Sequence, residues 1–396
     1  MPASGLLSRS FKRFFASEKA GGVLLLICTV VSLAVANSVM GESYRDLWQE
    51  RFLGMSVEHW INDGLMAVFF LLIGLELKRE FYNGELSHPR QALLPILAAA
   101  GGIVVPASIH FALNGGLPTQ PGIGIPMATD IAFALGALAL LGTRVPLSLR
   151  VFLTALAVMD DLGAIIVIAV FYSADIALPY LAGALGIFAI LRVLNRLRVL
   201  HLAPYLLLGA LMGFLMLRSG VHATIAGVLL AFGIPFSAMS DDAKSPSHRL
   251  EHWLHWRVAF VVLPLFALAN TAMAIGGNWT SELTSPNSLG ILIGLIVGKP
   301  VGIVLACAAA VAIGLCRVPA DLRWSHLVGA GMLGGIGFTM SIFIANLAFA
   351  GDPATIDSSK MAILCASLVA GILGYFWLRM TPAANQPPPD LPSTSS

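Results

Sequence analysis

Long apolar runs recur along the chain, and most of them approach the length that crosses a bilayer. They lie at about residues 20–36, 59–77, 92–113, 123–141, 148–172, 178–195, 203–217, 221–235, 253–275, 287–315, 325–350 and 361–379. A membrane helix needs about 20 apolar residues, so the pattern predicts about twelve spans. The runs at 203–217 and 221–235 are short, and they fit either two tilted spans or one re-entrant hairpin.

The composition agrees with a polytopic membrane protein. Of 396 residues, 57% are hydrophobic and 11% are charged, and few soluble domains have such a balance. The formal net charge of +2 is spread over loops, which argues against a nucleic-acid partner. The four cysteines lie in or beside apolar runs without the spacing of a metal site or a disulfide framework, so we interpret them as small hydrophobic residues.

Basic residues in the loops predict the orientation. Most of them fall on the side that carries both termini, whereas Arg45, Arg51, Arg218 and Lys360 fall on the other side. The positive-inside rule therefore predicts cytoplasmic termini. We divide the chain into one transmembrane domain over residues 1–380 and a disordered cytoplasmic tail over residues 381–396. Within the domain, residues 1–19 form a cytoplasmic amphipathic lead-in and residues 38–57 a periplasmic loop.

Two adjacent carboxylates, Asp160 and Asp161, lie in the middle of the run at 148–172. Each would cost roughly 2.5–3.5 kcal/mol if it faced lipid, so both must face a polar interior. Neighbouring residues of a helix point about 100° apart. We therefore predict two different roles for the pair.

Three further polar groups lie at membrane depth. Thr129 and Asp130 follow Gly122, Gly124 and Pro126, which predicts an interrupted helix whose exposed N–H groups need a carboxylate. A plain helix N-cap is the alternative for this pair, and the two interpretations overlap. Lys299 lies between Gly298 and Pro300; a partner carboxylate is the favoured interpretation, and snorkelling to the interface is the alternative.

The third group is a glycine-rich segment around Gly334, Gly335 and Gly337, followed by Thr339 and Ser341. Its string GIGFTMSIFIA resembles GIGIPMATDIA around Asp130. Paired interruptions at corresponding positions are typical of transporters that bind their substrate between inverted repeats.

These segments carry a family resemblance from about Lys19 to Arg379. The chain resembles the NhaA family of bacterial sodium/proton antiporters, itself a known example of inverted-topology repeats, in the strings INDGLMAVFFLLIGLELKRE, GIPMATDIAFALGALALLG, LAVMDDLGAIIVIAVFY, SGVHATIAGV, VGKPVGI and GGIGFTMSIFIANLAF. The resemblance implies an all-α polytopic fold with two discontinuous helices that cross at mid-membrane. It also implies a homodimer in the bacterial inner membrane.

The implied function is secondary active transport and not enzymatic catalysis. Cytoplasmic Na⁺ or Li⁺ would be exchanged for external H⁺ by alternating access, under pH regulation and without a cofactor. The resemblance implies that Asp161 is the principal sodium-binding carboxylate. Asp160 and Thr129 are further candidate Na⁺ ligands, because sodium fits oxygen ligands. The resemblance also implies that Lys299 pairs with Asp160 and that Asp130 offsets exposed helix ends.

Regulation by pH is implied at a cytoplasmic funnel. Glu76, Glu80, Glu251, His252 and His255 match positions near that funnel, and His222 is a further pH-sensing candidate in the matching segment SGVHATIAGV. The alternative for Glu251, His252 and His255 is the solvated start of a span, and for Glu76 and Glu80 an ordinary charge cluster at a helix end.

Two features depart from the family pattern. His255 is followed by Trp256 and Arg257 where Pro and Trp are expected, and the loop at 38–57 is short and charged where the family has a dimer-forming β-hairpin. Two rival functions are an intramembrane aspartyl protease and a cation channel. No Gly-x-Gly-Asp motif supports the protease, and no GxxxxGK[ST] loop supports ATP-driven pumping.

Overall fold

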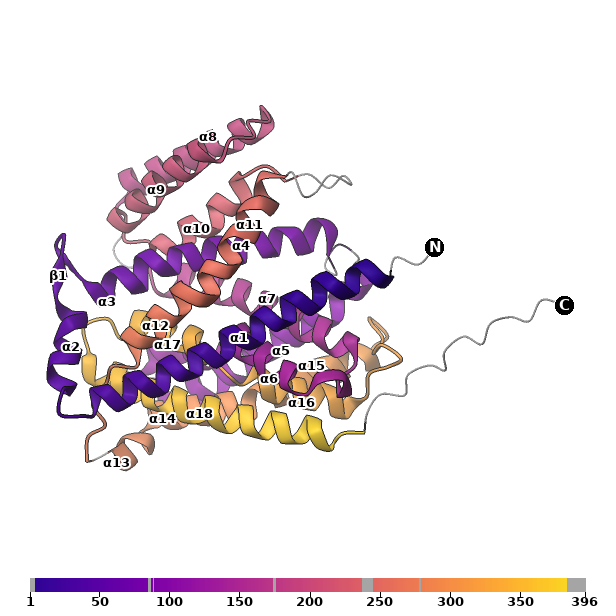
Figure 1. Ribbon diagram of the computed structural model, residues 1–396. Helices are drawn as coiled ribbons and strands as arrows, with labels where there is room; N and C mark the ends of the chain where they lie inside the picture. Colours follow the sequence, from indigo (N-terminus) through magenta and orange to yellow (C-terminus); the bar gives the residue numbers. More distant parts are fainter. Residues whose placement is uncertain are drawn as a thin grey trace.

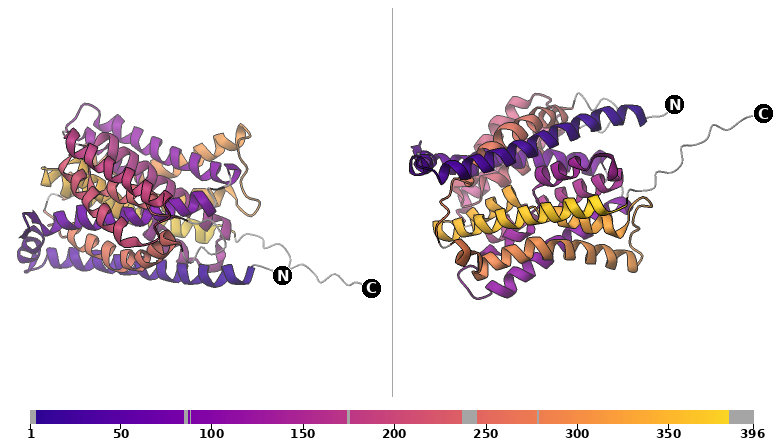
Figure 2. Two further views of the ribbon diagram at one scale, coloured as in Figure 1. Left: turned by 90° about the horizontal axis from the view of Figure 1, so that it is seen from above. Right: turned by 60° about the horizontal axis from the view of Figure 1, so that its bottom comes forward.

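The computed structural model describes residues 4–84, 87, 89–173, 176–236, 245–277 and 279–382, and nearly all of this part is helical. Figure 1 shows the helices, and Figure 2 shows that the long ones run roughly along one direction. The first described residue of helix α1 (Ser4–Ala36) and the last residue of α18 (Pro353–Met380) lie at the same end of the molecule. We name this the terminal end and the opposite one the far end.

Ten of the twelve predicted runs contain one candidate span each. Eight described segments are long and apolar enough to cross a membrane alone: Val57–Asn83, Ala92–Asn114, Gln120–Leu140, Leu147–Phe171, Leu178–Arg196, Pro246–Asn270, Pro286–Ala312 and Pro353–Met380. A ninth, in α1, is followed after a 114° bend by α2 (Gly41–Gln49). The tenth is the bent pair α16 (Trp324–Gly334) and α17 (Phe338–Ala348). The predicted polytopic all-α fold is thereby confirmed.

The two short runs form separate helices, α9 (Leu202–Arg218) and α10 (Ala223–Gly233). Helix α10 runs parallel to α4 (Met66–Asn83): Gly227 packs against the Ala67 carbonyl, and the Lys78 ammonium donates to the Ala231 carbonyl at 3.2 Å. The chain thus returns toward the terminal end after α9, which favours two spans over a re-entrant hairpin.

The helices form two packed groups. The first, which we call the peripheral bundle, contains α4 with its preceding turns α3 (Val57–His59) and η1 (Trp60–Leu65), α8 (Leu178–Arg196), α9, α10, α11 (Pro246–Arg257), η6 (Val258–Val262) and α12 (Leu263–Asn270). The second, the core bundle, contains α5 (Pro89–Asn114), η3 (Gln120–Met127), α6 (Ile131–Leu140), α7 (Leu147–Phe171), α14 (Pro286–Ile293), η7 (Gly294–Gly298), α15 (Lys299–Ala312) and α16–α18. Helix α1 packs on both bundles, against α6 and α12.

Two interrupted helices cross inside the core bundle. The first is η3 and α6, separated by residues 128–130, and the second is α16 and α17, separated by residues 335–337. The Asp130 N–H donates to the Ile336 carbonyl at 2.6 Å, and the Ser341 hydroxyl donates to the Ile125 carbonyl at 2.7 Å. Each interrupted helix thus donates a hydrogen bond to a backbone carbonyl of the other across the crossing point. The predicted pair of discontinuous helices is confirmed.

Two glycines allow α5 and α15 to touch through their backbones. A Cβ atom on Gly302 would overlap the Gly101 carbonyl and lie 2.9 Å from the Val105 Cβ, so only glycine fits there. Small residues of this kind let membrane helices approach closely. The contact holds Lys299, one turn before Gly302, firmly against α5.

The loop at 38–57 is more ordered than its short, charged sequence suggests. After α2 it forms a hairpin of β1 (Arg51–Phe52) and β2 (Met55–Ser56), the only strands in the described ranges. Leu53 and Gly54 at its tip have φ angles of 51° and 90°, as the tight turns of two-residue hairpins require. Near the unusual Trp256–Arg257 pair, α11 continues into η6 without a break, and Arg257 stacks on Trp253.

Two parts of the terminal segments lie outside the described residues. Residues 4–19 belong to α1, but their side chains are not described, so the amphipathic lead-in stays a prediction. The tail predicted over residues 381–396 is described only for Thr381 and Pro382.

Candidate functional site

Lys299 and Asp160 form an ion pair between α15 and α7. The Lys299 Nζ lies 2.8 Å from Asp160 Oδ2, and neither side chain is exposed. The same ammonium donates to the carbonyl of Met127, the last residue of η3. Lysine thus offsets the partial negative charge at the end of the first half-helix. A turn of π-helix, η7, directly precedes Lys299; such turns are frequent at functional sites.

Thr129 completes the surroundings of this ion pair. Its hydroxyl lies 2.6 Å from Asp160 Oδ2 and 2.9 Å from the carbonyl oxygen of Gly334, the last residue of α16. A hydroxyl has a single proton and can donate it to one acceptor at a time. Thr129 therefore connects the Asp160 carboxylate to the break in the second interrupted helix.

Asp161 differs sharply from its neighbour. Its side chain is fully buried, and neither carboxylate oxygen has a hydrogen-bond partner among the described residues; the same holds for Asp160 Oδ1. Buried polar atoms without partners are rare and need an explanation. The nearby charges that act on Asp161 are the carboxylates of Asp160, Asp130 and Glu76 and the ammonium of Lys299. The two aspartates thus have distinct environments, as their angular separation on a helix predicts.

Asp130 caps two half-helices at once. Its Oδ1 accepts from the Phe133 N–H at 3.1 Å in α6, and its Oδ2 accepts from the Thr339 N–H at 3.0 Å in α17 and from the Thr339 hydroxyl. Helix N-termini carry partial positive charge, which a carboxylate offsets. Asp130 is thus the N-cap of α6, and the same carboxylate also accepts from the first turn of α17.

Several candidate pH-sensing residues gather at the terminal end. Glu76 and Arg79 of α4 face α11, where His255 Nδ1 lies 3.5 Å from Glu76 and Glu251 bonds to Arg79. Glu80 lies 3.2 Å from Arg79. We call these five residues the charged cluster. The side chains of Glu76 and Glu251 are only 13% and 7% exposed, so this is a packed network and not a solvated helix end.

His252 and His222 lie apart from the charged cluster. His252 is exposed on the surface of α11. His222 precedes α10, and its Nε2 lies 2.9 Å from the carbonyl oxygen of Tyr172 at the end of α7. Because α10 runs parallel to α4 with Gly227 beside Ala67, His222 is roughly 20 Å from Glu76 along the helix axes. His222 therefore lies near the far end, away from the other pH-sensing candidates.

Comparison with known proteins identifies the family. The model of a family described as Na⁺/H⁺ antiporter 1 matches residues 12–378. The chain is 67% identical to the Na(+)/H(+) antiporter NhaA of Dechloromonas aromatica over 373 residues, which are 94% of this chain and 96% of that protein. It is 58% identical to the NhaA of Cytophaga hutchinsonii over 383 residues, with 96% and 98% of the two chains covered.

The chain belongs to this Na⁺/H⁺ antiporter family. The family is one of transporters, and the antiporter is a multi-pass membrane protein. Its described residues contain no group of three or more His, Cys, Asp or Glu side chains that could hold a metal ion.

One buried cation of the antiporter was missed by the sequence analysis. Lys78 is only 3% exposed, and its ammonium donates to the carbonyls of Ala231 and Ile234 at the end of α10. Arg192 and Asn195 of α8 bond to the neighbouring carbonyls of Phe232 and Gly233. Lys78 stands beside Arg79 in the sequence and looks like part of a cytoplasmic loop. Only the packing of α10 on α4 reveals it as a C-cap of another helix.

Proposed function

We propose that the antiporter exchanges cytoplasmic Na⁺ for external H⁺ at the buried pocket around Asp161, with Asp160 and Thr129 as further ligands. What supports this site is the contrast between two adjacent carboxylates. Asp160 is neutralised by Lys299 at 2.8 Å, whereas both oxygens of Asp161 lack partners among the described residues. A buried carboxylate without a partner must bind a proton or a cation, because a bare charge there is too costly.

The proposed mechanism is competition between Na⁺ and protons for this pocket. A carboxylate must lose its proton before it can coordinate a metal ion, so cation binding releases protons. Proton binding in turn expels the cation. A second proton is assigned to Asp160 and Lys299 as a pair, because groups this close titrate together. Li⁺ is proposed as an alternative cargo, since it takes the same oxygen ligands.

Alternating access in this proposal is a rocking of the core bundle against the peripheral bundle. The core bundle carries Asp160, Asp161 and Lys299, and the peripheral bundle carries the charged cluster. Glu76 of the charged cluster lies on α4, which packs against α7 of the core bundle, and this contact supports the cluster as the link between cytoplasmic pH and the ion pocket. We propose that the terminal end faces the cytoplasm.

We propose the membrane location from the relatives and the oligomeric state from the exposed hairpin. Bacterial relatives support a location in the bacterial inner membrane. A homodimer is supported by the hairpin of β1 and β2, where Phe52 and Leu53 are 63% and 77% exposed. Large exposed apolar side chains outside the apolar spans commonly mark interaction sites.

The decisive test uses everted membrane vesicles that contain the full chain and are acidified by respiration. Addition of Na⁺ or Li⁺, across a pH series, should release the quenching of a pH-reporting dye, and K⁺ should not. Vesicles with Asp161→Asn are the matched control and should show no release. A response to K⁺ equal to that to Na⁺, or single-channel currents from the reconstituted protein, would support a cation channel instead. Cleavage of a transmembrane peptide by the solubilised protein would support the protease.

A further inference from the structure

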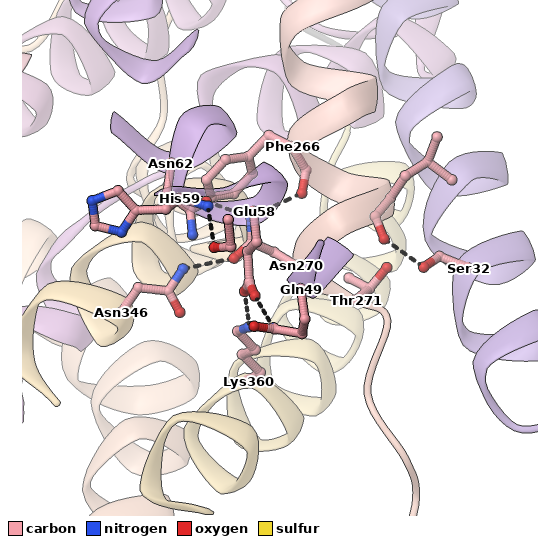
Figure 3. A network of polar contacts seen from close by, with 12 residues as sticks. Ser32, Gln49, Glu58, His59, Asn62, Phe266, Asn270, Thr271, Asn346 and Lys360 are labelled. Atoms are coloured by element: carbon pink, nitrogen blue, oxygen red, sulfur yellow. Dashed lines mark hydrogen bonds and ion pairs between the residues drawn. The ribbon is translucent and has the colours of Figure 1, made fainter. Parts of the chain in front are cut away.

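The two bundles are joined by polar contacts at the far end. Asn346 of α17 donates to Asn270 of α12 at 2.6 Å, Lys360 of α18 lies 3.4 Å from Glu58 of α3, and His222 bonds to the Tyr172 carbonyl. Figure 3 shows the first two of these contacts side by side. Each contact has one partner in the core bundle and one in the peripheral bundle.

Asn270 has the best-defined geometry of these residues. Its side-chain NH₂ group donates one hydrogen to Asn62 Oδ1 at 2.7 Å and the other to the Phe266 carbonyl at 3.0 Å, while its Oδ1 accepts from Asn346 Nδ2. Asn270 is 1% exposed. Each hydrogen of the amide thus has one acceptor, so this buried side chain is fixed in one orientation.

Asn346 connects this amide to the candidate ion site. It lies two turns after Thr339 on α17, and Thr339 is the residue that Asp130 caps at the crossing point. Helix α17 is therefore held at its start by Asp130 within the core bundle and near its end by Asn270 of the peripheral bundle. A rocking movement that separates the bundles at the far end must break the bond between Asn270 and Asn346.

We propose that Asn270 and Asn346 form the latch that keeps the ion pocket closed toward the far end, and that the latch opens in each exchange cycle. The proposal rests on the alternating access proposed above. Both residues act as positioning residues, because neither contacts Asp160 or Asp161. The ion pair of Glu58 and Lys360 also holds the two bundles together at the far end, because it joins α3 to α18.

The first test replaces Asn346 by leucine, which is similar in size but has no amide. A net hydrogen bond of this kind shifts a two-state equilibrium by several-fold to about tenfold. Asn346→Leu should therefore populate the state that is open at the far end. In right-side-out vesicles the apparent KM for external Na⁺ should fall by this factor, and in everted vesicles the KM for cytoplasmic Na⁺ should rise.

The matched control is Asn114→Leu. Asn114 is a buried amide at the same end, but its side chain donates to the His110 and Pro286 carbonyls within the core bundle. This variant should lose stability without changing the ratio of the two KM values. An unchanged ratio in Asn346→Leu, or the same ratio in both variants, would overturn the latch. Wild-type exchange in the same vesicles reports separately on the proposed function.

A second variant covers the case in which Asn346→Leu does not fold. Asn270→Cys combined with Asn346→Cys, in a background without the four native cysteines, can be closed by oxidation and reopened by a thiol reductant. Oxidation should stop exchange from both sides, reduction should restore it, and each single cysteine variant should be insensitive. Continued exchange by the fully oxidised double variant would contradict the proposal.

Discussion

Lys299 and Asp160 are each other's only charged partner within 4 Å among the described residues, and they lie 2.8 Å apart with no exposed surface. Removal of one member leaves a buried charge uncompensated, which costs about 3–5 kcal/mol, whereas removal of both is much milder. We expect Lys299→Met and Asp160→Asn each to lower the thermal midpoint of the purified protein. The double variant should recover most of the loss.

The control for this pair is Lys360→Met at the far end, where Lys360 and its partner Glu58 are 6% and 21% exposed and lie 3.4 Å apart. Because this pair is longer and its carboxylate reaches solvent, the midpoint should fall less than in Lys299→Met. A double variant as unstable as the single ones would show that the ion pair is not the source of the effect.

Replacement of Asp161 should not destabilise the protein as replacement of Asp160 does. Its carboxylate has no hydrogen-bond partner among the described residues, so Asp161→Asn removes a costly group and should leave the thermal midpoint unchanged or raised. Exchange of Na⁺ should nevertheless be abolished, because the cation loses its charged ligand. Midpoint and dye dequenching are measured on the same preparation. Normal exchange rates in a folded Asp161→Asn protein would refute the assignment of this residue.

Binding of Na⁺ should strengthen as the pH rises. Each proton that the cation displaces makes the apparent Kd fall about tenfold per pH unit, until the carboxylate is already deprotonated and the Kd becomes constant. Calorimetry of the purified protein in two buffers with different ionisation enthalpies gives both the Kd and the number of protons released. Equal affinity at every pH, without proton release, would exclude the competition mechanism.

The charged cluster should set the pH at which exchange begins. Glu251→Gln removes one negative charge beside Arg79 and His248 in a site that is only 7% exposed. The remaining groups should then release their protons at lower pH, so the activity profile should move to lower pH by up to about one unit. His252→Gln on the exposed face of the same helix is the control and should leave the profile in place.

The sequence predicted the parts of the fold that depend on local patterns. Apolar runs located the spans because a bilayer imposes their length, and glycines with Pro126 located the first interruption because they weaken a helix. Asp160 and Asp161 stood out because charge is rare inside such runs. Their different surroundings followed from helix geometry alone.

Other features depend on partners that are distant in the chain. Asn270 and Asn346 are 76 positions apart, and Lys78 caps carbonyls more than 150 positions away, so no local pattern marks either contact. The exact start of α11 at Pro246 was also not predicted, because its first residues are polar and lie outside the apolar run at 253–275. Tertiary packing brings these residues together. The periodic pattern of apolar residues in one sequence reports local structure and does not show which distant residues meet.

The backbone contact between Gly101 and Gly302 restricts the movement of α5 relative to α15. No side chain separates the two helices there, so neither can slide or tilt against the other without a steric clash. Under the proposed rocking movement, Lys299 should therefore move together with α5. The distance between α5 and α15 should therefore stay constant. It can serve as a fixed reference against which displacements of the other helices are measured.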